Sequence, residues 1–275
     1  MKTIIVTGAN SGIGKEAALN LASSGHRILM LCRDSEKSVQ AQKDIVLQSG
    51  NQNVFLIPVD LANPASIRTA VDQIKDQYPV IDVLVNNAGI YKVKREETAN
   101  GVEMSLAVNY LAPFMLSQML LENLAASSEG RIINVVSELY KNGIIDFENL
   151  MMETGYKVGT AYANAKLASV LYTAELARRV SGEGIMVNAM HPGVLATSAF
   201  RDYSTLVMNL FNLFLENPKK GGERIAHLAT SDELKGVTGK YFYKLEQREL
   251  EIPVQETEKS ERLWGLAEQL TGLAG

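Results

Sequence analysis

Cysteine, histidine and surplus basic charge are all scarce in this chain. Only one of its 275 residues, Cys32, is a cysteine, which excludes an internal disulfide framework and suits a reducing compartment. The three histidines, His26, His191 and His227, are scattered along the sequence, so we expect no metal site. The net charge is −4 and no block of basic residues occurs, which gives no reason to expect a nucleic-acid partner.

Long apolar runs are absent as well. No uncharged apolar stretch reaches the ~18 residues that a membrane-spanning helix needs. Residues 1–7 lead directly into a glycine-rich turn and leave no room for a signal peptide. We therefore expect no integral membrane segment and a cytoplasmic location. The hydrophobic share of 46% and the charged share of 21% are typical of a globular protein with a substantial core.

Short apolar segments rich in β-branched residues alternate with helical patterns along most of the chain. The expected strands are residues 3–6, 27–31, 54–58, 80–85, 131–136 and 184–189, and the expected helices are residues 13–24, 36–48, 64–77, 101–126 and 160–180. Apolar residues run continuously through these strands, as they do when both faces of a parallel sheet are buried. The order predicts an α/β fold with a doubly wound parallel sheet and helices on both faces, in a single domain over residues 1–275.

The last third of the chain is less regular. A helix is expected over residues 218–229, a strand over 236–243 and a closing helix over 256–270. The segment of about 198–217 is rich in Leu, Phe and Met and follows the last main strand. It is either a lid over a lipophilic substrate or a helix that completes the core, and both interpretations stay open. Peripheral membrane contact is less favoured, because the segment lacks the Lys and Arg that such helices carry.

A glycine-rich turn joins the first strand to the first helix, in the sequence Thr-Gly-Ala-Asn-Ser-Gly-Ile-Gly. Gly8, Gly12 and Gly14 permit a tight turn and a close approach of the backbone to a ligand. The free N–H groups and the dipole of the following helix favour an anionic pyrophosphate. Together with the surrounding strand–helix–strand unit, this turn predicts nucleotide binding.

Tyr162 and Lys166 are four residues apart in an uninterrupted helical stretch, so they lie on the same helix face. A free phenol titrates near pH ~10, and a neighbouring cation favours the phenolate. The pair is therefore a candidate proton donor and acceptor. Taken alone, Tyr and Lys at this spacing more often form a solvated helix face, and the other motifs have to decide.

In these motifs the chain resembles the short-chain dehydrogenase/reductase family, over roughly residues 2–245. The glycine turn has the family's T-G-x-x-x-G-x-G spacing, the sequence Asn-Asn-Ala-Gly ends at Gly89, and Tyr162 and Lys166 form the family's Y-x-x-x-K pair. The resemblance implies a Rossmann-like fold and hydride transfer between a nicotinamide cofactor and a carbonyl or alcohol substrate. It implies the catalytic residues Asn109, Ser137, Tyr162 and Lys166. It also implies that the cofactor contacts Gly8, Asn10, Ser11, Gly12, Ile13, Gly14, Arg33, Asp60, Leu61, Asn87, Ala88, Gly89, Tyr162, Lys166, Pro192, Gly193, Val194 and Thr197.

The resemblance also assigns a role to each catalytic side chain. Ser137 would bond the substrate oxygen, Tyr162 would pass the proton, and Asn109 would support a water in a proton relay. Lys166 would lower the pKa of the phenol and hold the nicotinamide ribose.

Arg33 follows the second strand, at the position where an acidic residue would bond a ribose 2′-hydroxyl and an Arg would accommodate a 2′-phosphate. Although Asp34 follows directly, we expect NADP(H) in preference to NAD(H).

Ser137 and Tyr162 are 25 positions apart, roughly double the separation in many family members, and residues 141–150 fill the difference. This spacing, together with Cys32-Arg33-Asp34 and the sequence Glu-Leu-Ala-Arg-Arg that ends at Arg179, resembles the retinol dehydrogenase and WW-domain-oxidoreductase-like branch of the family, which implies apolar aldehydes, ketones or alcohols as substrates. Family members often pair through the helices that correspond to 101–126 and 160–180, so a homodimer or homotetramer is expected. The rival interpretations are a non-catalytic dinucleotide-binding or interaction protein on the same fold, and a glycine-loop methyltransferase.

Overall fold

The strands of the computed structural model, which describes residues 1–193, 217–252 and 258–273, form one sheet. The spatial order of its eight strands is β3-β2-β1-β4-β5-β6-β7-β8. Seven strands are parallel: β1 (Thr3–Thr7), β2 (Arg27–Cys32), β3 (Val54–Pro58), β4 (Val83–Asn86), β5 (Gly130–Val135), β6 (Ile185–His191) and β7 (Tyr241–Tyr243). The chain moves outward from β1 to β3 and then returns to the other side of β1. This reversal between β1 and β4 confirms the doubly wound α/β fold.

An antiparallel strand, β8 (Glu246–Arg248), closes the sheet beside β7. The sequence did not predict it, because Glu-Gln-Arg has no apolar residue to form a buried face. All three residues are exposed, which fits a short, charged edge strand that discourages pairing with another chain.

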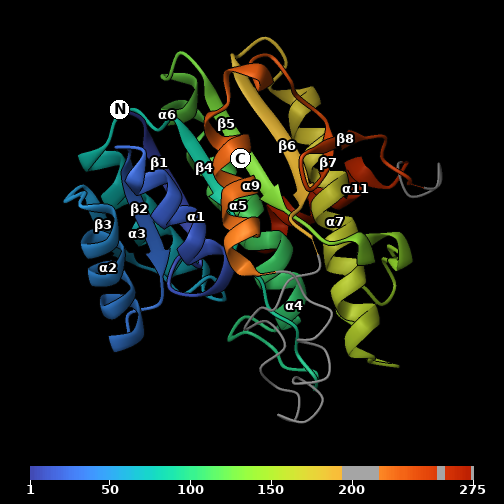
Figure 1. Ribbon diagram of the computed structural model, residues 1–275. Coiled ribbons are helices and arrows are strands. Elements are labelled where there is room, and N and C mark those ends of the chain that lie inside the picture. Colours follow the sequence, from blue (N-terminus) through green and yellow to red (C-terminus); the bar gives the residue numbers. More distant parts are fainter. Residues whose placement is uncertain (194–216, 253–257, 274–275) are drawn as a thin grey trace.

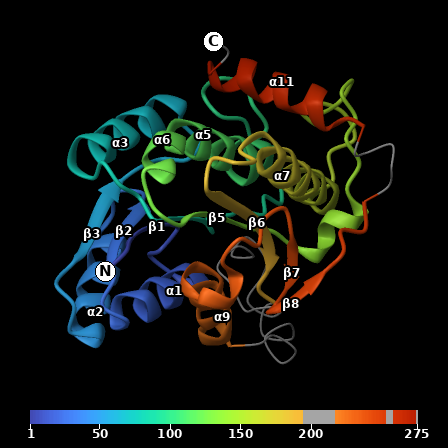
Figure 2. The same cartoon turned by 90° about the horizontal axis from the view of Figure 1, so that it is seen from above.

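Helices cover both faces of the sheet (Figures 1 and 2). One face carries α1 (Gly12–Ser23), α2 (Glu36–Ser49) and α9 (Pro218–Thr230). The other carries α3 (Pro64–Gln77), α5 (Ala112–Met119), α6 (Leu121–Ala125), α7 (Val158–Arg179) and α11 (Ser260–Thr271). Alternate residues of each strand therefore enter two separate apolar cores, as Ile4 and Ile5 of β1 do. The expected helix starts are confirmed where the caps are strongest, since the Asn63 side chain accepts the Ala65 N–H before Pro64.

The helix expected over residues 101–126 is the main departure from the predicted elements. The chain instead forms α4 (Met104–Leu106), a π-helical turn (Ala107–Leu111), α5 and α6. Pro113 has no N–H to donate to the carbonyl of Asn109, four residues earlier, and its ring crowds that carbonyl. The wider π turn accommodates this defect and places Asn109 at its centre.

The C-terminal helix α11 lies across α5 and α7 (Figure 2). Trp264 is 5% exposed and packs on Phe114 and Tyr172, with ring centroids 5.0 and 5.6 Å away. Arg68 of α3 donates to the carbonyls of Thr271 and Gly272 and so caps the helix end. Helix α11 thus covers part of the surface through which pairing was expected. None of the helices in the described ranges is long and apolar enough to cross a bilayer.

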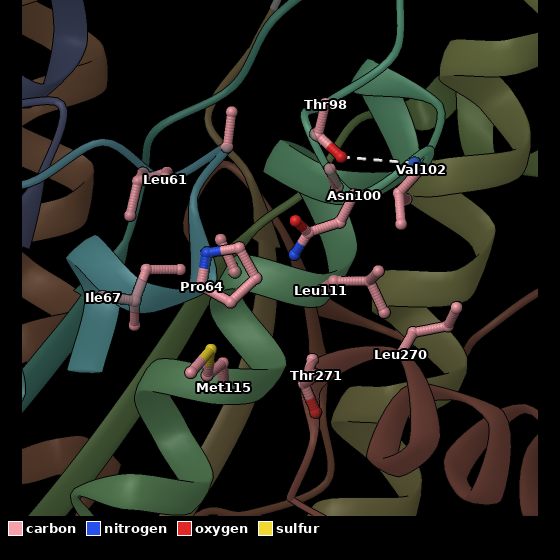
Figure 3. A pocket seen from close by; sticks show the side chains of 13 residues that line it. Leu61, Pro64, Ile67, Thr98, Asn100, Val102, Leu111, Met115, Leu270 and Thr271 are labelled. Atoms are coloured by element: carbon pink, nitrogen blue, oxygen red, sulfur yellow. Dashed lines mark hydrogen bonds between the residues drawn. The ribbon is translucent and has the colours of Figure 1, made fainter.

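A cavity of about 20 Å³ lies between α3, α5 and the end of α11 (Figure 3). Its lining is mostly apolar and includes Leu61, Ile67, Met115 and Leu270. The volume is close to that of one water molecule, so this cavity is a packing gap rather than a site for a dinucleotide. The candidate site lies instead at the carboxyl ends of the parallel strands, the lower edge of the sheet in Figure 1.

Candidate active site

The glycine turn is joined to the end of β4 by one threonine. The Thr7 hydroxyl accepts the backbone N–H groups of Asn87 and Ala88, each at 2.9 Å, and the Asn87 side-chain amide donates to the Thr7 carbonyl at 2.9 Å. The Asn-Asn-Ala-Gly segment and the glycine turn therefore form one rigid floor across β1 and β4.

Two glycines of this turn have no room for a side chain. A Cβ on Gly14 would lie 2.4 Å from the Asn87 side-chain nitrogen and 2.6 Å from the Gly8 carbonyl oxygen. Gly8 has φ +66°, which favours glycine, and a Cβ there would lie 3.1 Å from the Cα of Ala88. The first turn of α1 follows directly, with N–H groups that have no acceptor within the helix. This cradle fits the pyrophosphate of a dinucleotide.

The end of β2 is tied to the same turn. The Asn10 side chain donates to the Ser38 hydroxyl at 2.8 Å, and that hydroxyl donates to the Arg33 carbonyl at 2.8 Å. Arg33 and Asp34 are both exposed, so their side chains can reach a ligand on the turn. Cys32 is buried behind the turn, and burial raises the pKa of its thiol to about 11, which leaves it unreactive at neutral pH.

Ser137, Tyr162 and Lys166 come together at the carboxyl end of β5. Tyr162 and Lys166 lie one turn apart on α7, and the Lys166 ammonium is 5.7 Å from the centroid of the Tyr162 ring. The same ammonium donates to the Val135 carbonyl at 2.9 Å. Ser137 follows β5, and its hydroxyl lies near enough to the Tyr162 phenol to act on its pKa. The structure thus brings together three of the four residues expected to be catalytic.

Burial shifts the pKa values of both members of the pair. Desolvation raises the pKa of Tyr162 to about 12, although the neighbouring Ser137 hydroxyl acts in the opposite direction. Desolvation also lowers the pKa of Lys166 to about 8. Both shifts have one cause, because a low-dielectric environment disfavours the charged form of each group. The role of Lys166 in lowering the pKa of the phenol stays a prediction.

Asn109 completes the site through the backbone of the loop after β4. Its side chain accepts the Ile90 N–H at 2.8 Å and donates to the Ile90 carbonyl at 3.0 Å. Because Pro113 has no N–H to donate, the Asn109 carbonyl lacks its usual helical donor and accepts the Ser169 hydroxyl of α7 instead, at 2.7 Å. Gly89 is packed between Asn109 and Lys166, since a Cβ there would lie 3.2 and 3.7 Å from their polar atoms. The fourth expected catalytic residue therefore lies near Lys166, separated from it by Gly89.

The remaining residues expected to contact the cofactor lie in the segments after β3 and after β6. The Asp60 carboxylate is exposed and accepts the Ala62 N–H of its own turn at 3.0 Å, and the Leu61 side chain lines the small cavity of Figure 3. Pro192 is buried after β6, and its carbonyl accepts the Arg224 guanidinium at 2.6 Å, with Gly193 next to it. Val194, Thr197 and nearly all of the expected lid at 198–217 lie outside the described residues.

Two residues near the site were not predicted from the sequence. Tyr91 packs on the ring of Tyr162, with ring centroids 5.1 Å apart. Ser169 lies one turn beyond Lys166 and holds the Asn109 carbonyl. The i, i+3 spacing from Lys166 and the proline four residues after Asn109 are signals that could have identified Ser169. Tyr91 lies in an irregular loop that gives no periodic signal.

A doubly wound sheet with a glycine cradle between β1 and α1, and a Ser–Tyr–Lys group beside it, defines a nicotinamide-dependent oxidoreductase of the Rossmann type. The short chain dehydrogenase family model matches residues 2–205. This chain belongs to the short-chain dehydrogenase/reductase family. It is 41% identical to human retinol dehydrogenase 13, over 99% of this chain and 85% of the relative. It is 37% identical to human retinol dehydrogenase 11, over 99% and 86%.

Solved structures agree with this membership. An uncharacterized protein from Mycobacterium paratuberculosis superimposes with a TM-score of 0.78 at 28% identity, over 99% of this chain and 94% of the other. A short chain dehydrogenase from Shigella flexneri complexed with NADP gives a TM-score of 0.70 at 26% identity, over 89% and 97%. The chain is therefore an NAD(P)-dependent dehydrogenase or reductase of alcohol and carbonyl groups, resembling the retinol dehydrogenases. These comparisons favour an enzyme over a non-catalytic binding protein.

Proposed function

We propose that this protein transfers a hydride between NADP(H) and a lipophilic carbonyl or alcohol substrate, with Tyr162 as the general acid or base. The observation that carries the proposal is the grouping of Ser137 and Tyr162 one helical turn from the buried Lys166 ammonium, with the Ser137 hydroxyl near enough to the Tyr162 phenol to act on its pKa. These three groups lie at the carboxyl edge of the sheet, where ligands bind in doubly wound folds.

The cofactor has a matching cradle in this chain. The Gly8 and Gly14 backbones and the N-terminus of α1 would hold its pyrophosphate, and Lys166 would hold the nicotinamide ribose. The bound nicotinamide supplies or accepts the hydride. Asn10, Ser11, Gly12, Ile13, Asn87, Ala88 and Gly89 lie in the segments that form the cradle. Contacts from Asp60, Leu61, Pro192, Gly193, Val194 and Thr197 also remain part of the proposal.

Each catalytic side chain has one task. In the direction of reduction, Ser137 donates a hydrogen bond to the carbonyl oxygen and Tyr162 delivers its proton to that oxygen. Lys166 stabilises the resulting phenolate by its charge, which is strong in a desolvated site. Asn109 fixes the Ile90 backbone through its side chain, and its carbonyl has a second lone pair for a relay water besides the bond from Ser169.

Arg33 supports the preference for NADP(H), because it is exposed at the end of β2, beside the glycine turn. A guanidinium there would pair with a 2′-phosphate in two parallel hydrogen bonds. The NADP complex of the Shigella flexneri relative points the same way. The retinol dehydrogenase names of the relatives support a lipophilic substrate.

The test is a panel of aldehydes, ketones and alcohols followed at the nicotinamide absorbance, with NADPH and NADH compared. We expect turnover of apolar members of the panel, with NADPH preferred. The Arg33→Ala variant should bind NADPH about tenfold or more weakly while its NADH affinity stays within about twofold, because only the 2′-phosphate is lost as a partner. Equal losses for both cofactors would contradict the cofactor assignment.

A cytoplasmic location and a homodimer or homotetramer are part of the proposal as well. Trp264 and the rest of α11 cover part of the helix surface on which such pairing would depend. Light scattering of the purified protein would decide the oligomeric state, and localisation of a tagged copy would decide the compartment.

A further inference from the structure

Tyr91 lies against the ring of Tyr162 in the loop that follows β4. The two ring centroids are 5.1 Å apart and the rings are inclined by 57°. The Tyr91 side chain is half-buried, and its hydroxyl oxygen would be 3.6 Å from a Cβ on Gly159. The ring therefore spans from Tyr162 to the first turn of α7.

Both backbone neighbours of Tyr91 are held by hydrogen bonds. The Asn109 side chain bonds both polar backbone groups of Ile90, at 2.8 and 3.0 Å. On the other side, the Tyr156 hydroxyl donates to the Lys92 carbonyl at 2.7 Å. Further along the loop, the Arg95 guanidinium donates to the Met151 carbonyl at 3.2 and 3.1 Å. Tyr91 is therefore a fixed part of the site, and its loop is tied to the segment between the 141–150 insert and α7.

The position of Tyr91 along α7 places it on the side of Tyr162 away from Lys166. Lys166 lies about one turn from Tyr162 toward the C-terminus of α7 and donates to the Val135 carbonyl at the end of β5. Gly159 lies almost one turn from Tyr162 in the other direction, at the N-terminus of α7. Groups that would hold the cofactor lie on the Lys166 side. Tyr91 therefore borders Tyr162 on the side away from these groups, where a substrate can meet the phenol.

We propose that Tyr91 is a specificity-determining residue, an aromatic wall beside Tyr162 that favours flat, aromatic or conjugated carbonyl substrates over carbonyls with bulky saturated groups next to the reacting carbon. This inference rests on the proposed function. A flat π system can pack against the Tyr91 ring in the offset or edge-to-face arrangements that aromatic pairs favour. A saturated ring is thicker and would clash with the Tyr91 ring, which its backbone neighbours hold in place.

Benzaldehyde and cyclohexanecarbaldehyde test the inference, because both carry a six-membered ring on the aldehyde and differ mainly in flatness. The wild-type enzyme should have a kcat/KM for benzaldehyde about tenfold above that for cyclohexanecarbaldehyde. Tyr91→Ala and Tyr91→Leu should bring the ratio to about one, whereas Tyr91→Phe, which keeps the ring, should preserve it. Tyr78→Ala is the matched control, because Tyr78 is also half-buried against one aromatic ring, Phe55, in a different part of the fold.

Titration of each variant with NADPH, followed by fluorescence, shows that the cradle is folded independently of turnover. An unchanged ratio in a Tyr91→Ala or Tyr91→Leu protein that binds NADPH would overturn the inference, as would a wild type without preference for the flat aldehyde. If the wild type reduces neither aldehyde but reduces other members of the carbonyl panel, the inferred substrate class is wrong and the proposed function stands. If it reduces nothing in the panel, the proposed function itself fails.

Discussion

Lys166 should destabilise the folded protein at neutral pH, since this charged residue is only 4% exposed. Desolvation lowers the pKa of Lys166 from 10.5 to about 8. At about 1.4 kcal/mol per pKa unit, this difference corresponds to about 3 kcal/mol against folding when both states are protonated. Replacing Lys166 with Met removes the buried charge and keeps a side chain of similar length. It also leaves the Val135 carbonyl without its 2.9 Å partner, at a cost of about 1 kcal/mol. We therefore expect Lys166→Met to be more stable than the wild type by about 2 kcal/mol at pH 7.

The pH dependence gives this prediction its signature. Between pH 8 and 10.5 the unfolded chain holds the lysine proton and the folded chain has released it, so wild-type stability rises with pH. The variant lacks this ionisation, and groups common to both proteins contribute equally to the two curves. The advantage of Lys166→Met should therefore shrink above pH 8 and vanish by about pH 10.

Urea unfolding at pH 7 and pH 9.5, without added cofactor, measures both quantities. Lys75→Met is the control, because the Lys75 side chain is 39% exposed and its removal should change stability little at either pH. A Lys166→Met protein less stable than the wild type at pH 7, or one whose advantage is the same at both pH values, would refute the reasoning. Activity should be lost in either case, since the variant has no cation beside Tyr162.

Two further predictions concern the cradle and the π turn. Gly14→Ala should weaken NADPH binding by about tenfold or more, because its Cβ would lie 2.6 Å from the Gly8 carbonyl oxygen. Gly265→Ala, where a Cβ meets nothing within 4 Å, should leave binding unchanged, and a fluorescence titration compares the two. Ser169→Ala should lose about 1 kcal/mol of stability and lower kcat severalfold, because the Asn109 carbonyl loses its 2.7 Å donor. Urea unfolding and steady-state kinetics measure these effects. A wild-type kcat in Ser169→Ala would show that Ser169 does not contribute to catalysis.

The parts of the fold that sequence reasoning captured have short-range physical causes. Continuous apolar runs predicted the buried parallel strands, and Asn63 before Pro64 predicted the start of α3. The cluster of Ser137, Tyr162 and Lys166 was reached because two of these residues share one helix face and the resemblance supplied the third.

What sequence reasoning missed depends on contacts between distant segments. The π turn at Asn109 follows from Pro113 together with Ser169, which is 60 positions away from Asn109 in the chain. The high pKa of Tyr162 follows from burial, which no spacing of residues reveals. Tyr91 reaches Tyr162 through an irregular loop that Tyr156 and Arg95 hold in place. The assignment of residues 1–275 to one domain remains a prediction.

The most direct test of the central claim is the turnover number of Tyr162→Phe on the best substrate of the carbonyl panel at saturating NADPH. The substitution removes only the hydroxyl, which lies near Ser137, and keeps the ring that packs on Tyr91. A positioned acid or base contributes about 10²–10⁴ in rate, so kcat should fall by at least about a hundredfold while NADPH affinity is retained. Turnover at the wild-type rate would contradict the assignment of Tyr162 as the proton donor and acceptor.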